Sequence, residues 1–290
     1  FYTQQGTSYV AQDPGNYDIL TRAEDGTYLV LQKTQVRWRF SAGGVLSELV
    51  DRNGNAVSLT YDGNGHLITV AEPGGRSLSF EYDGSGRITS IVDALPRTVR
   101  FTYDVGGGLQ SITDADGHVE EYTYDANGQM LTATDPRGAV YMTNTYDATK
   151  RVVTWQSDAK GNQFQFEYNE ASGETRITDP LGQVSVDGHD VLRRLVRQTD
   201  RLGRSVSYTY DDKNNRTSVT DQNGHTTTYS YDSVGNVVGK VDPLGQSIAI
   251  TYDAQHNPLT RTDEARNVTR FSYDGRGNVT STIDPLGHVT

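Results

Sequence analysis

The sequence of 290 residues contains no cysteine, so it has neither a disulfide framework nor a thiolate metal site. Hydrophobic residues make up only 34% of the chain, which is low for a compact globule of this length. Basic residues are also scarce, and the net charge of −11 disfavours a broad nucleic-acid interface. No apolar run approaches the ~18–20 residues that a membrane-spanning helix requires. We therefore expect a thin, high-surface architecture that sheet pairing stabilises.

What the sequence does contain is one dipeptide at a fixed interval. Tyr-Asp recurs in steps of 21 or 22 residues, and two further units carry Tyr168-Asn169 and His189-Asp190 in the same slot. A fixed period over eleven units indicates one supersecondary unit copied many times, so a residue at one repeat phase is interpreted first as structural. The complete pairs are Tyr61-Asp62, Tyr82-Asp83, Tyr103-Asp104, Tyr124-Asp125, Tyr146-Asp147, Tyr210-Asp211, Tyr231-Asp232, Tyr252-Asp253 and Tyr273-Asp274.

A second landmark, Asp-x-x-Gly, follows the Tyr-Asp slot by about eleven residues. Aspartate can bond its own backbone two residues on, and glycine supplies a positive φ, so this pattern predicts a tight turn. Tyr-Asp is itself followed by a glycine turn, so each unit should hold two turns and two strands. The Asp-x-x-Gly turns lie at Asp51–Gly54, Asp114–Gly117, Asp200–Gly203 and Asp221–Gly224, and in a proline-containing form at Asp135–Gly138, Asp179–Gly182, Asp242–Gly245 and Asp284–Gly287.

The segment before each Tyr-Asp pair alternates between apolar and small polar residues. Leu59 and Tyr61 flank Thr60, for example, which predicts a half-buried strand with an aromatic or aliphatic face and a Ser/Thr face. In the second segment of the unit the apolar residues sit three apart, as at Leu109 and Ile112, which indicates a bulge or a strong twist. No stretch shows helical periodicity, so the predicted fold class is all-β.

The number of predicted strands bears on the shape of the sheet. Eleven units of two strands give about 22 strands, or roughly 105 Å of sheet at a spacing of ~4.8 Å. Twisted open sheets rarely exceed ~10 strands without curling, and barrels of ~16–18 strands already leave a channel. We therefore expect a ribbon of strands that curls or spirals into a hollow shell, or into part of one.

Two regions are expected along the chain. Residues 1–35 lack Tyr-Asp but still predict strands, with a hairpin turn at Asp25-Gly26, and we interpret them as an N-terminal capping or lead-in segment. Residues 36–290 form an array of about 11–12 units, of which 36–51 is a degenerate first one. Because the chain starts without methionine and stops inside a unit, we expect an array truncated at its C-terminal end and a piece of a longer protein.

Taken together, these motifs resemble the RHS (rearrangement hot spot) or YD-repeat family over about residues 36–290. The pattern is Gly-x-x-(Val/Thr)-x-(Phe/Tyr)-x-Tyr-Asp-x-x-Gly-x-(Leu/Val), followed by Asp-(Pro/x)-x-Gly. The family includes bacterial Rhs polymorphic toxins, cocoon proteins of insecticidal toxin complexes, wall-associated toxins and teneurins. The resemblance implies a β-ribbon wound into a hollow shell, which in bacterial members encloses a variable C-terminal toxin.

The resemblance also implies partners and a location. Expected partners are the protein's own C-terminal toxin cargo, the remainder of the shell, a secretion-apparatus component and an immunity protein that acts on the cargo, with no nucleic acid and no membrane-spanning segment. The protein would be secreted or delivered from bacteria by contact-dependent or type VI-like export, or displayed at the cell surface. Any enzymatic activity would lie in a C-terminal toxin domain that this sequence does not contain.

Family members cleave themselves at an end-of-core segment rich in Gly, Asn, Tyr and Pro, which is missing here. The tetrad from Asp284 to Gly287 resembles one element of it, but the same tetrad recurs at Asp179 and Asp242, so we interpret it as an ordinary turn. No autoprotease residue is assigned, and no catalytic residue, metal or cofactor is expected.

Histidine and aspartate side chains are the candidates for catalysis or metal binding. His118, His225 and His288 all follow the glycine of an Asp-x-x-Gly turn, which favours a tolerated strand-entry position over a general base or metal ligand. His189 occupies a tyrosine slot. The best local candidate for calcium is Asp114-Ala-Asp116-Gly117, although turn chemistry explains it without an ion.

The tyrosine stripe allows three interpretations: packing between strands, a lining for unfolded cargo, or stacking platforms for sugars. These lead to two hypotheses for function. The first is a non-enzymatic shell that encloses a toxin until delivery. The alternative is an extracellular module that binds glycans or proteins through an exposed sheet face. No group of residues in the sequence has the composition and spacing that a catalytic site would need.

Overall fold

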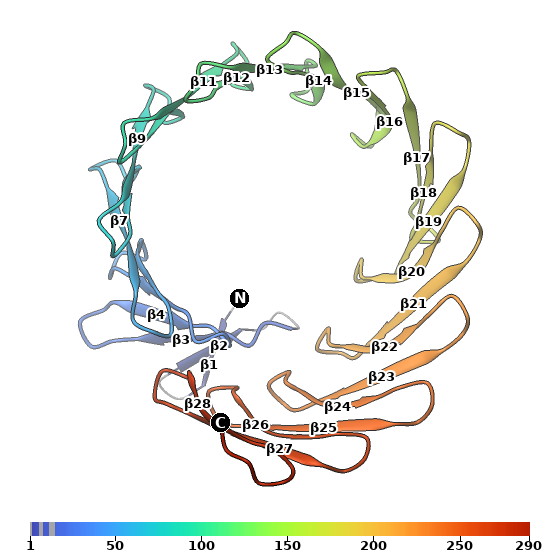
Figure 1. Cartoon of the computed structure of the whole chain (residues 1–290). Helices are drawn as coiled ribbons and strands as arrows, with labels where there is room; N and C mark the ends of the chain where they lie inside the picture. Colours follow the sequence, from blue (N-terminus) through green and yellow to red (C-terminus); the bar gives the residue numbers. More distant parts are fainter. Residues whose placement is uncertain (1, 6–7, 12–14) are drawn as a thin grey trace. The chain divides into compact units, whose positions relative to one another are not determined.

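The computed structural model describes residues 2–5, 8–11 and 15–290, and within them the chain is all-β, with 28 strands and no helix. Figure 1 shows the strands following one another in the order of the chain. Residues 1, 6–7 and 12–14 of the expected lead-in segment lie outside the described residues. No helix suited to crossing a bilayer occurs in the part of the chain that the structure describes. The all-β prediction is confirmed.

The strands divide into a first set of six and a second set of 22. The first set is β1 (Tyr2–Gln5), β2 (Ser8–Ala11), β3 (Ile19–Arg22), β4 (Tyr28–Leu31), β5 (Arg37–Phe40) and β6 (Leu46–Val50). The second set is β7 (Ala56–Tyr61), β8 (Leu67–Ala71), β9 (Ser77–Tyr82), β10 (Ile88–Asp93), β11 (Thr98–Tyr103), β12 (Leu109–Thr113), β13 (Val119–Tyr124), β14 (Met130–Thr134), β15 (Val140–Tyr146), β16 (Val153–Asp158), β17 (Gln163–Asn169), β18 (Glu174–Thr178), β19 (Val184–His189), β20 (Leu195–Thr199), β21 (Ser205–Tyr210), β22 (Arg216–Thr220), β23 (Thr226–Tyr231), β24 (Val237–Val241), β25 (Ser247–Tyr252), β26 (Pro258–Thr262), β27 (Val268–Tyr273) and β28 (Val279–Ile283). The second set supplies two strands for each of eleven units, as the repeat period predicts.

The strands form one antiparallel sheet whose described pairings join neighbours in sequence. Tyr103 faces Leu109, whereas Thr102 faces Ser111, so Gln110 is an extra residue in β12. The same bulge occurs in β6, β10, β14, β16, β20, β22, β24, β26 and β28. The bulge brings apolar residues that are three apart onto one face, which confirms the bulge predicted from their spacing.

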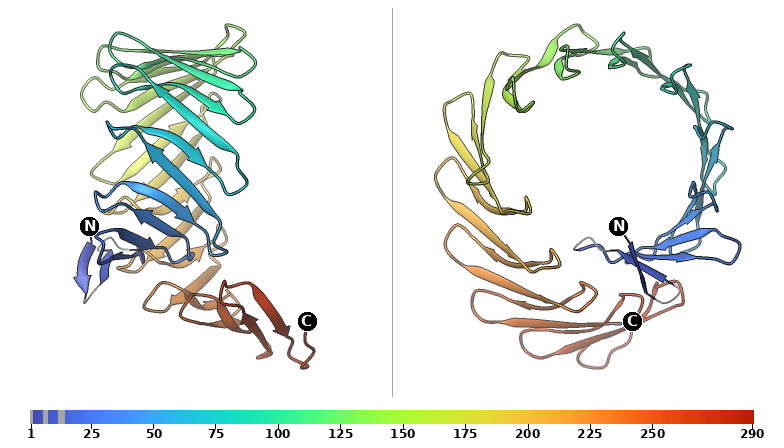
Figure 2. Two further views of the ribbon diagram at one scale, coloured as in Figure 1. Left: turned by 90° about the vertical axis from the view of Figure 1, so that its left-hand side faces the viewer. Right: turned by 180° about the vertical axis from the view of Figure 1, so that it is seen from behind.

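The chain divides into two compact units. Unit 1 comprises Phe1–Leu59 together with Val206–Thr290, and unit 2 comprises Thr60–Ser205. Unit 1 thus holds the first six strands and the last repeats, while unit 2 holds β8 to β20. The strands of unit 2 lie in a single layer (Figure 2). The expected division at residues 35 and 36 stays a prediction.

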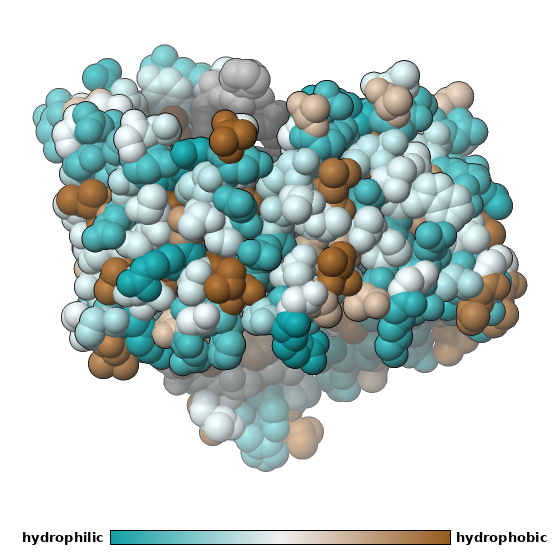
Figure 3. All heavy atoms as spheres, turned by 90° about the horizontal axis from the view of Figure 1, so that it is seen from above, coloured by the Kyte–Doolittle hydropathy of each residue, from teal (hydrophilic) through white to brown (hydrophobic). Residues whose placement is uncertain are grey.

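Few side chains are fully buried in this sheet. Among the described residues, the buried apolar ones are Val30, Val50 and Ala133. The chain exposes 18303 Å², against roughly 12,000 Å² for a compact protein of its mass. On the face seen in Figure 3, apolar residues stand singly among polar ones. The thin, high-surface architecture expected from the composition is therefore present, because most strands have no second layer to cover them.

Candidate functional site

Each unit is organised around aspartates that close its turns. In the turn at Asp125, the backbone N–H of Asp125 donates to the Gln129 carbonyl (2.9 Å), and Gly128 donates to the Asp125 carbonyl (3.0 Å). The carboxylate Oδ1 of Asp125 accepts the N–H groups of Asn127 and Gln129 at 2.8 Å each. Gly128 has a φ of 74°, a left-handed value that favours glycine. Aspartate thus satisfies two backbone donors inside a five-residue hairpin loop.

The Asp-x-x-Gly turns have the same geometry, although the sequence presents them as a separate landmark. The carboxylates of Asp135, Asp179, Asp242 and Asp284 each accept backbone N–H groups from the second and fourth residues after them. Positive φ values occur at Gly138, Gly182, Gly245 and Gly287. One turn design is therefore used twice per unit. We name the two rows of turns the Tyr-Asp margin and the Asp-x-x-Gly margin of the ribbon.

The structure places the predicted tyrosines at the ends of strands and the paired aspartates at the first position of the turn that follows. Strand β19 ends instead at His189, and β17 ends one residue beyond Tyr168. Strands β7, β9, β11, β13, β15, β21, β23, β25 and β27 end at Tyr61, Tyr82, Tyr103, Tyr124, Tyr146, Tyr210, Tyr231, Tyr252 and Tyr273.

Five of the tyrosine hydroxyls at this slot link their unit to the one before it. Tyr103 donates to the carbonyl of Ile88 (2.7 Å), and Ile88 faces Tyr82, the tyrosine of the preceding unit. Equivalent bonds of 2.8–2.9 Å run from Tyr82, Tyr146, Tyr231 and Tyr252 to the carbonyls of Leu67, Met130, Arg216 and Val237. Burial raises the pKa of Tyr252, so its hydroxyl stays protonated and able to donate. We name this series of bonds the tyrosine ladder.

A second ladder runs along the other face of the strands. Thr102 and Ser111 lie opposite each other and share a hydrogen bond of 2.7 Å, as do Thr251 and Thr260. Further pairs join Thr123 to Thr132 and Thr209 to Ser218. The alternation of apolar and Ser/Thr residues is thus matched by two kinds of cross-strand contact. For the tyrosines, these contacts favour packing between strands; cargo lining and sugar stacking stay predictions.

The turn bonds also hold the aspartates in their ionised form. The backbone N–H of Arg87 and then its guanidinium lower the pKa of Asp83. The hydroxyl of Thr149 is the largest cause that lowers the pKa of Asp147 to about 2. The carboxylates of Asp83 and Asp147 therefore remain charged far into the acidic range.

The histidines that the sequence singled out lie at the fourth residue after a turn aspartate. The Nδ1 atoms of His118, His225 and His288 lie 3.0, 3.2 and 2.7 Å from the Oδ2 atoms of Asp114, Asp221 and Asp284. Arginine and asparagine fill this position in other turns and contact the same oxygen. The position at the start of the strand therefore accepts any side chain that donates to the aspartate.

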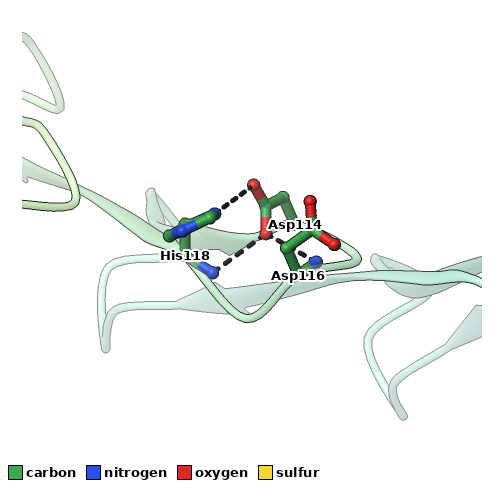
Figure 4. Close-up of side chains that lie close together, drawn as sticks. All are labelled: Asp114, Asp116 and His118. Carbon is green, nitrogen blue, oxygen red and sulfur yellow. Dashed lines mark hydrogen bonds and ion pairs between the residues drawn. The ribbon is translucent and has the colours of Figure 1, made fainter.

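Asp114, Asp116 and His118 form a group whose ligand atoms lie within 4.8 Å of one another, the one such group in the described part of the chain. Figure 4 shows their side chains around one exposed turn. Both carboxylate oxygens of Asp114 are already occupied, Oδ1 by the N–H groups of Asp116 and His118 at 2.9 Å and Oδ2 by the imidazole. Turns without a second carboxylate make the same bonds, so turn chemistry accounts for this group and we assign no metal to it.

Unit 2 contains an open hollow whose lining residues include aromatic ones from two neighbouring strands. Trp155 and Tyr168 are 40% and 37% exposed, and both line the hollow together with Phe166 and Lys150. These residues belong to β16, β17 and the preceding turn, the zone where the repeat is least regular. Exposed aromatics around an open hollow are the feature that the alternative binding hypothesis requires.

Leucines on the Asp-x-x-Gly margin are almost fully exposed. They occupy the second position after the aspartate of the turn. Their exposed fractions are 72% for Leu95, 80% for Leu181, 75% for Leu202 and 82% for both Leu244 and Leu286. Apolar side chains repeated along one margin mark it as a candidate contact surface.

Sequence reasoning missed the residues that join the first hairpins to the last four Tyr-Asp turns within unit 1. A signal in the sequence could have found them. Among the Tyr-Asp turns, only these four have asparagine at the fourth position after the aspartate. The four asparagines are Asn215, Asn236, Asn257 and Asn278.

The comparisons with known proteins agree with the repeat pattern. The family model for the teneurin YD-shell matches residues 10–185, more than half of the chain. The RHS repeat model matches residues 193–221, 210–247 and 252–289. Among curated proteins, no relative matches the chain.

Several solved structures share the fold. A TcdB2–TccC3–TEV structure is 14% identical, with 100% of this chain and 22% of that chain covered and a TM-score of 0.52. A TcdB2–TccC3 structure is also 14% identical, with coverages of 94% and 21% and a TM-score of 0.51. The Photorhabdus luminescens Tc holotoxin pore is 13% identical, with coverages of 98% and 21% and a TM-score of 0.45. The chain spans about a fifth of the length of these structures.

Proposed function

Because this chain belongs to the RHS/YD-repeat family, we propose that it forms part of the wall of a hollow shell that encloses a C-terminal toxin cargo until delivery. The observation that carries the proposal is an antiparallel ribbon in which paired strands, aspartate-closed turns and the tyrosine ladder leave only short connections from β3 to β28. A wall with these properties separates two compartments without any catalysis. Its fold is similar to that of the TcdB2–TccC3 structures, which supports the toxin context.

The wall would act by physical exclusion. A cargo segment behind a continuous sheet is out of reach of proteases and of its own targets in the producing cell. The net charge of −11 would keep the outer surface soluble. Since the chain spans about a fifth of the structures it resembles, further shell would complete the enclosure.

Limited proteolysis of the cargo tests this proposal. A C-terminal cargo segment is expressed together with the complete shell that contains this ribbon, and its cleavage is followed over time. We expect cleavage to be much slower than for the same segment expressed alone. Cleavage at equal rates in the two samples would contradict enclosure. The matched control replaces the shell by an unrelated folded protein of similar charge fused at the same point.

A binding module is the second candidate, favoured by the aromatic hollow of Trp155 and Tyr168 in unit 2. Aromatic faces of this kind stack on sugar rings, which extracellular recognition would use. A glycan array with the wild-type chain and with Trp155→Ala tests it. Binding that the substitution abolishes would favour this function, whereas an array without signal would count against it.

A further inference from the structure

Within unit 1, the turns of the first hairpins lie against the Tyr-Asp margin of the last four units. The Tyr17 hydroxyl donates to Oδ1 of Asn215 (3.2 Å), and the Lys33 ammonium donates to the carbonyl of Gly235 (2.5 Å). Lys33 also lies 5.3 Å from the centroid of the Tyr17 ring. A Cβ atom at Gly235 would overlap the Tyr17 ring, so glycine is required there by the close approach as well as by its φ of 73°.

The next turn of the first segment continues this series of contacts. Nη2 of Arg52 donates to Oδ1 of Asn257 (2.8 Å), and Nδ2 of Asn278 donates to Oδ1 of Asn53 (3.3 Å). A Cβ atom at Gly277 would overlap the Arg52 guanidinium. Successive turns of one segment thus meet successive turns of the other in the same order.

The asparagines on the Tyr-Asp margin suit this contact because each side chain both donates and accepts. Their Nδ2 atoms donate to the carboxylates of their own turns, Asp211, Asp232, Asp253 and Asp274, at 2.8–2.9 Å. In Asn215 and Asn257 the Oδ1 atom then accepts from the opposite segment, which an arginine in the same place cannot do. Asn236 and Asn257 are each only 5% exposed.

The other complete turns of this margin carry different side chains at the same position. The fourth residue after the aspartate is histidine, arginine, glycine or glutamine in the turns that precede the four, namely His66, Arg87, Gly108, Gln129 and Arg194. Asparagine is therefore not a requirement of the turn itself. Its occurrence in four consecutive units coincides with the stretch that the first hairpins contact.

We propose that Asn215, Asn257 and Asn278 form a recognition row for the turns of the first hairpins, and that this row determines which repeat lies against which hairpin. Arginine at position 257 would place a second cation against Arg52, and arginine at position 215 or 257 would remove the acceptor. The partner of the row is the segment from Tyr17 to Asn53 of the same chain. The inference concerns how the ribbon holds itself together and does not depend on what it encloses.

Thiol cross-linking in the complete chain tests the recognition row. Since the chain has no cysteine, Asn53→Cys and Arg276→Cys introduce two unique thiols on opposite sides of the contact. Asn53→Cys removes the acceptor for Asn278 but leaves the Tyr17–Asn215 and Arg52–Asn257 bonds that the variants test. A short bis-maleimide reagent is added to dilute protein, and the linked peptides are identified by mass spectrometry. We expect an intrachain link as the main product.

The decisive variant adds Asn215→Arg and Asn257→Arg to this background. The yield of the intrachain link should fall roughly tenfold, because the acceptor of a charged hydrogen bond is lost from the row. The matched control adds Asn162→Arg and Asn267→Arg, which contact their own aspartates at 2.8 and 3.0 Å in exposed turns of the other margin. This control should leave the yield unchanged.

A second variant changes the partner of the row instead of the row itself, and it leaves every turn aspartate in place. Arg52→Ala removes the donor to Asn257, and it should lower the yield as the arginine pair does, while Arg76→Ala should not. Circular dichroism verifies that each variant is folded. A yield that neither Arg52→Ala nor the arginine pair lowers would overturn the proposal. A linked dimer as the main product would overturn it as well, because the row would then bind a second copy.

Discussion

Most Tyr-Asp turns of unit 2 close with the same backbone bonds as those at the end of unit 1, but the side chain at the fourth residue after the aspartate differs. In unit 2, His66 stacks on the ring of Tyr82 at 4.7 Å, and the Arg87 guanidinium lies 4.5 Å from the centroid of Tyr103. In unit 1 the same position holds asparagine, as at Asn257, and faces another segment of the chain. The fourth residue after the aspartate therefore decides whether a unit covers its own next tyrosine or receives a separate hairpin.

The largest effect should come from acid, which acts on both regions alike. Turn aspartates in both units have lowered pKa values in the folded chain, as do Asp83 in unit 2 and Asp274 in unit 1, and Asp147 has a pKa of about 2 against an ordinary value of 3.8. Their contribution to stability is complete above the ordinary pKa and is lost as the pH falls through the folded value. Hydrogen exchange of peptides from both units, followed from about pH 5 to about pH 2, should show protection lost together. If only one unit lost its protection, the aspartate turns of the two regions would not be equivalent.

Removing one aspartate should have the next largest effect. Asp253→Ala deletes the acceptor for the N–H groups of Gln255 and Asn257 and for the Asn257 side chain. We expect the free energy of unfolding in urea to fall by about 2–3 kcal/mol, since backbone donors lose a charged partner. Asp253→Asn is the control, because its side-chain oxygen still accepts, and it should lose less. Equal losses would show that charge, rather than hydrogen bonding, carries the effect.

The tyrosine ladder should respond equally in the two regions. Tyr103→Phe in unit 2 and Tyr252→Phe in unit 1 each remove one hydroxyl bond to a backbone carbonyl. Each should lower the free energy of unfolding by about 0.5–1.5 kcal/mol. Chemical denaturation of both single variants and of the double variant measures this. A clear difference between the two single variants would mean that the recognition row supports its own tyrosines.

The smallest effect should come from exchanging the variable side chain in unit 2. Arg87→Asn keeps a donor to Asp83 but removes the cation from the ring of Tyr103, which should cost about 0.5–1 kcal/mol. Arg87→Lys retains a cation and should recover part of the loss in the same denaturation assay. If Arg87→Asn stabilised the chain, the division of roles at this position would be wrong.

Much of the fold is predictable because its determinants are local. The period of Tyr-Asp predicts where strands end, and the three-residue spacing of Leu109 and Ile112 predicts the bulge at Gln110. The end of the strand is predictable even in the degenerate unit, since β19 ends at His189, which occupies the tyrosine position. These features depend on residues within one unit, where sequence distance and spatial distance are similar.

The contacts that escaped prediction join residues far apart in the chain. Tyr17 and Asn215 are separated by 198 residues, and Arg52 and Asn257 by 205. Periodicity within a unit carries no information about such pairs. The equivalence of the two turns was also missed, because the tyrosine before Asp62 and the proline after Asp242 conceal a common pattern of bonds around aspartate.

The closure of most turns within five residues has a consequence for how such a gene can change. A duplication or deletion of one whole unit leaves the remaining hairpins with their own hydrogen bonds, and a tyrosine of the ladder, such as Tyr103, would still find a carbonyl one unit back. The length of the ribbon can thus drift by recombination between copies without a folding penalty at the junction. Only the row of asparagines registers the change, since it alone is matched to a particular place elsewhere in the chain.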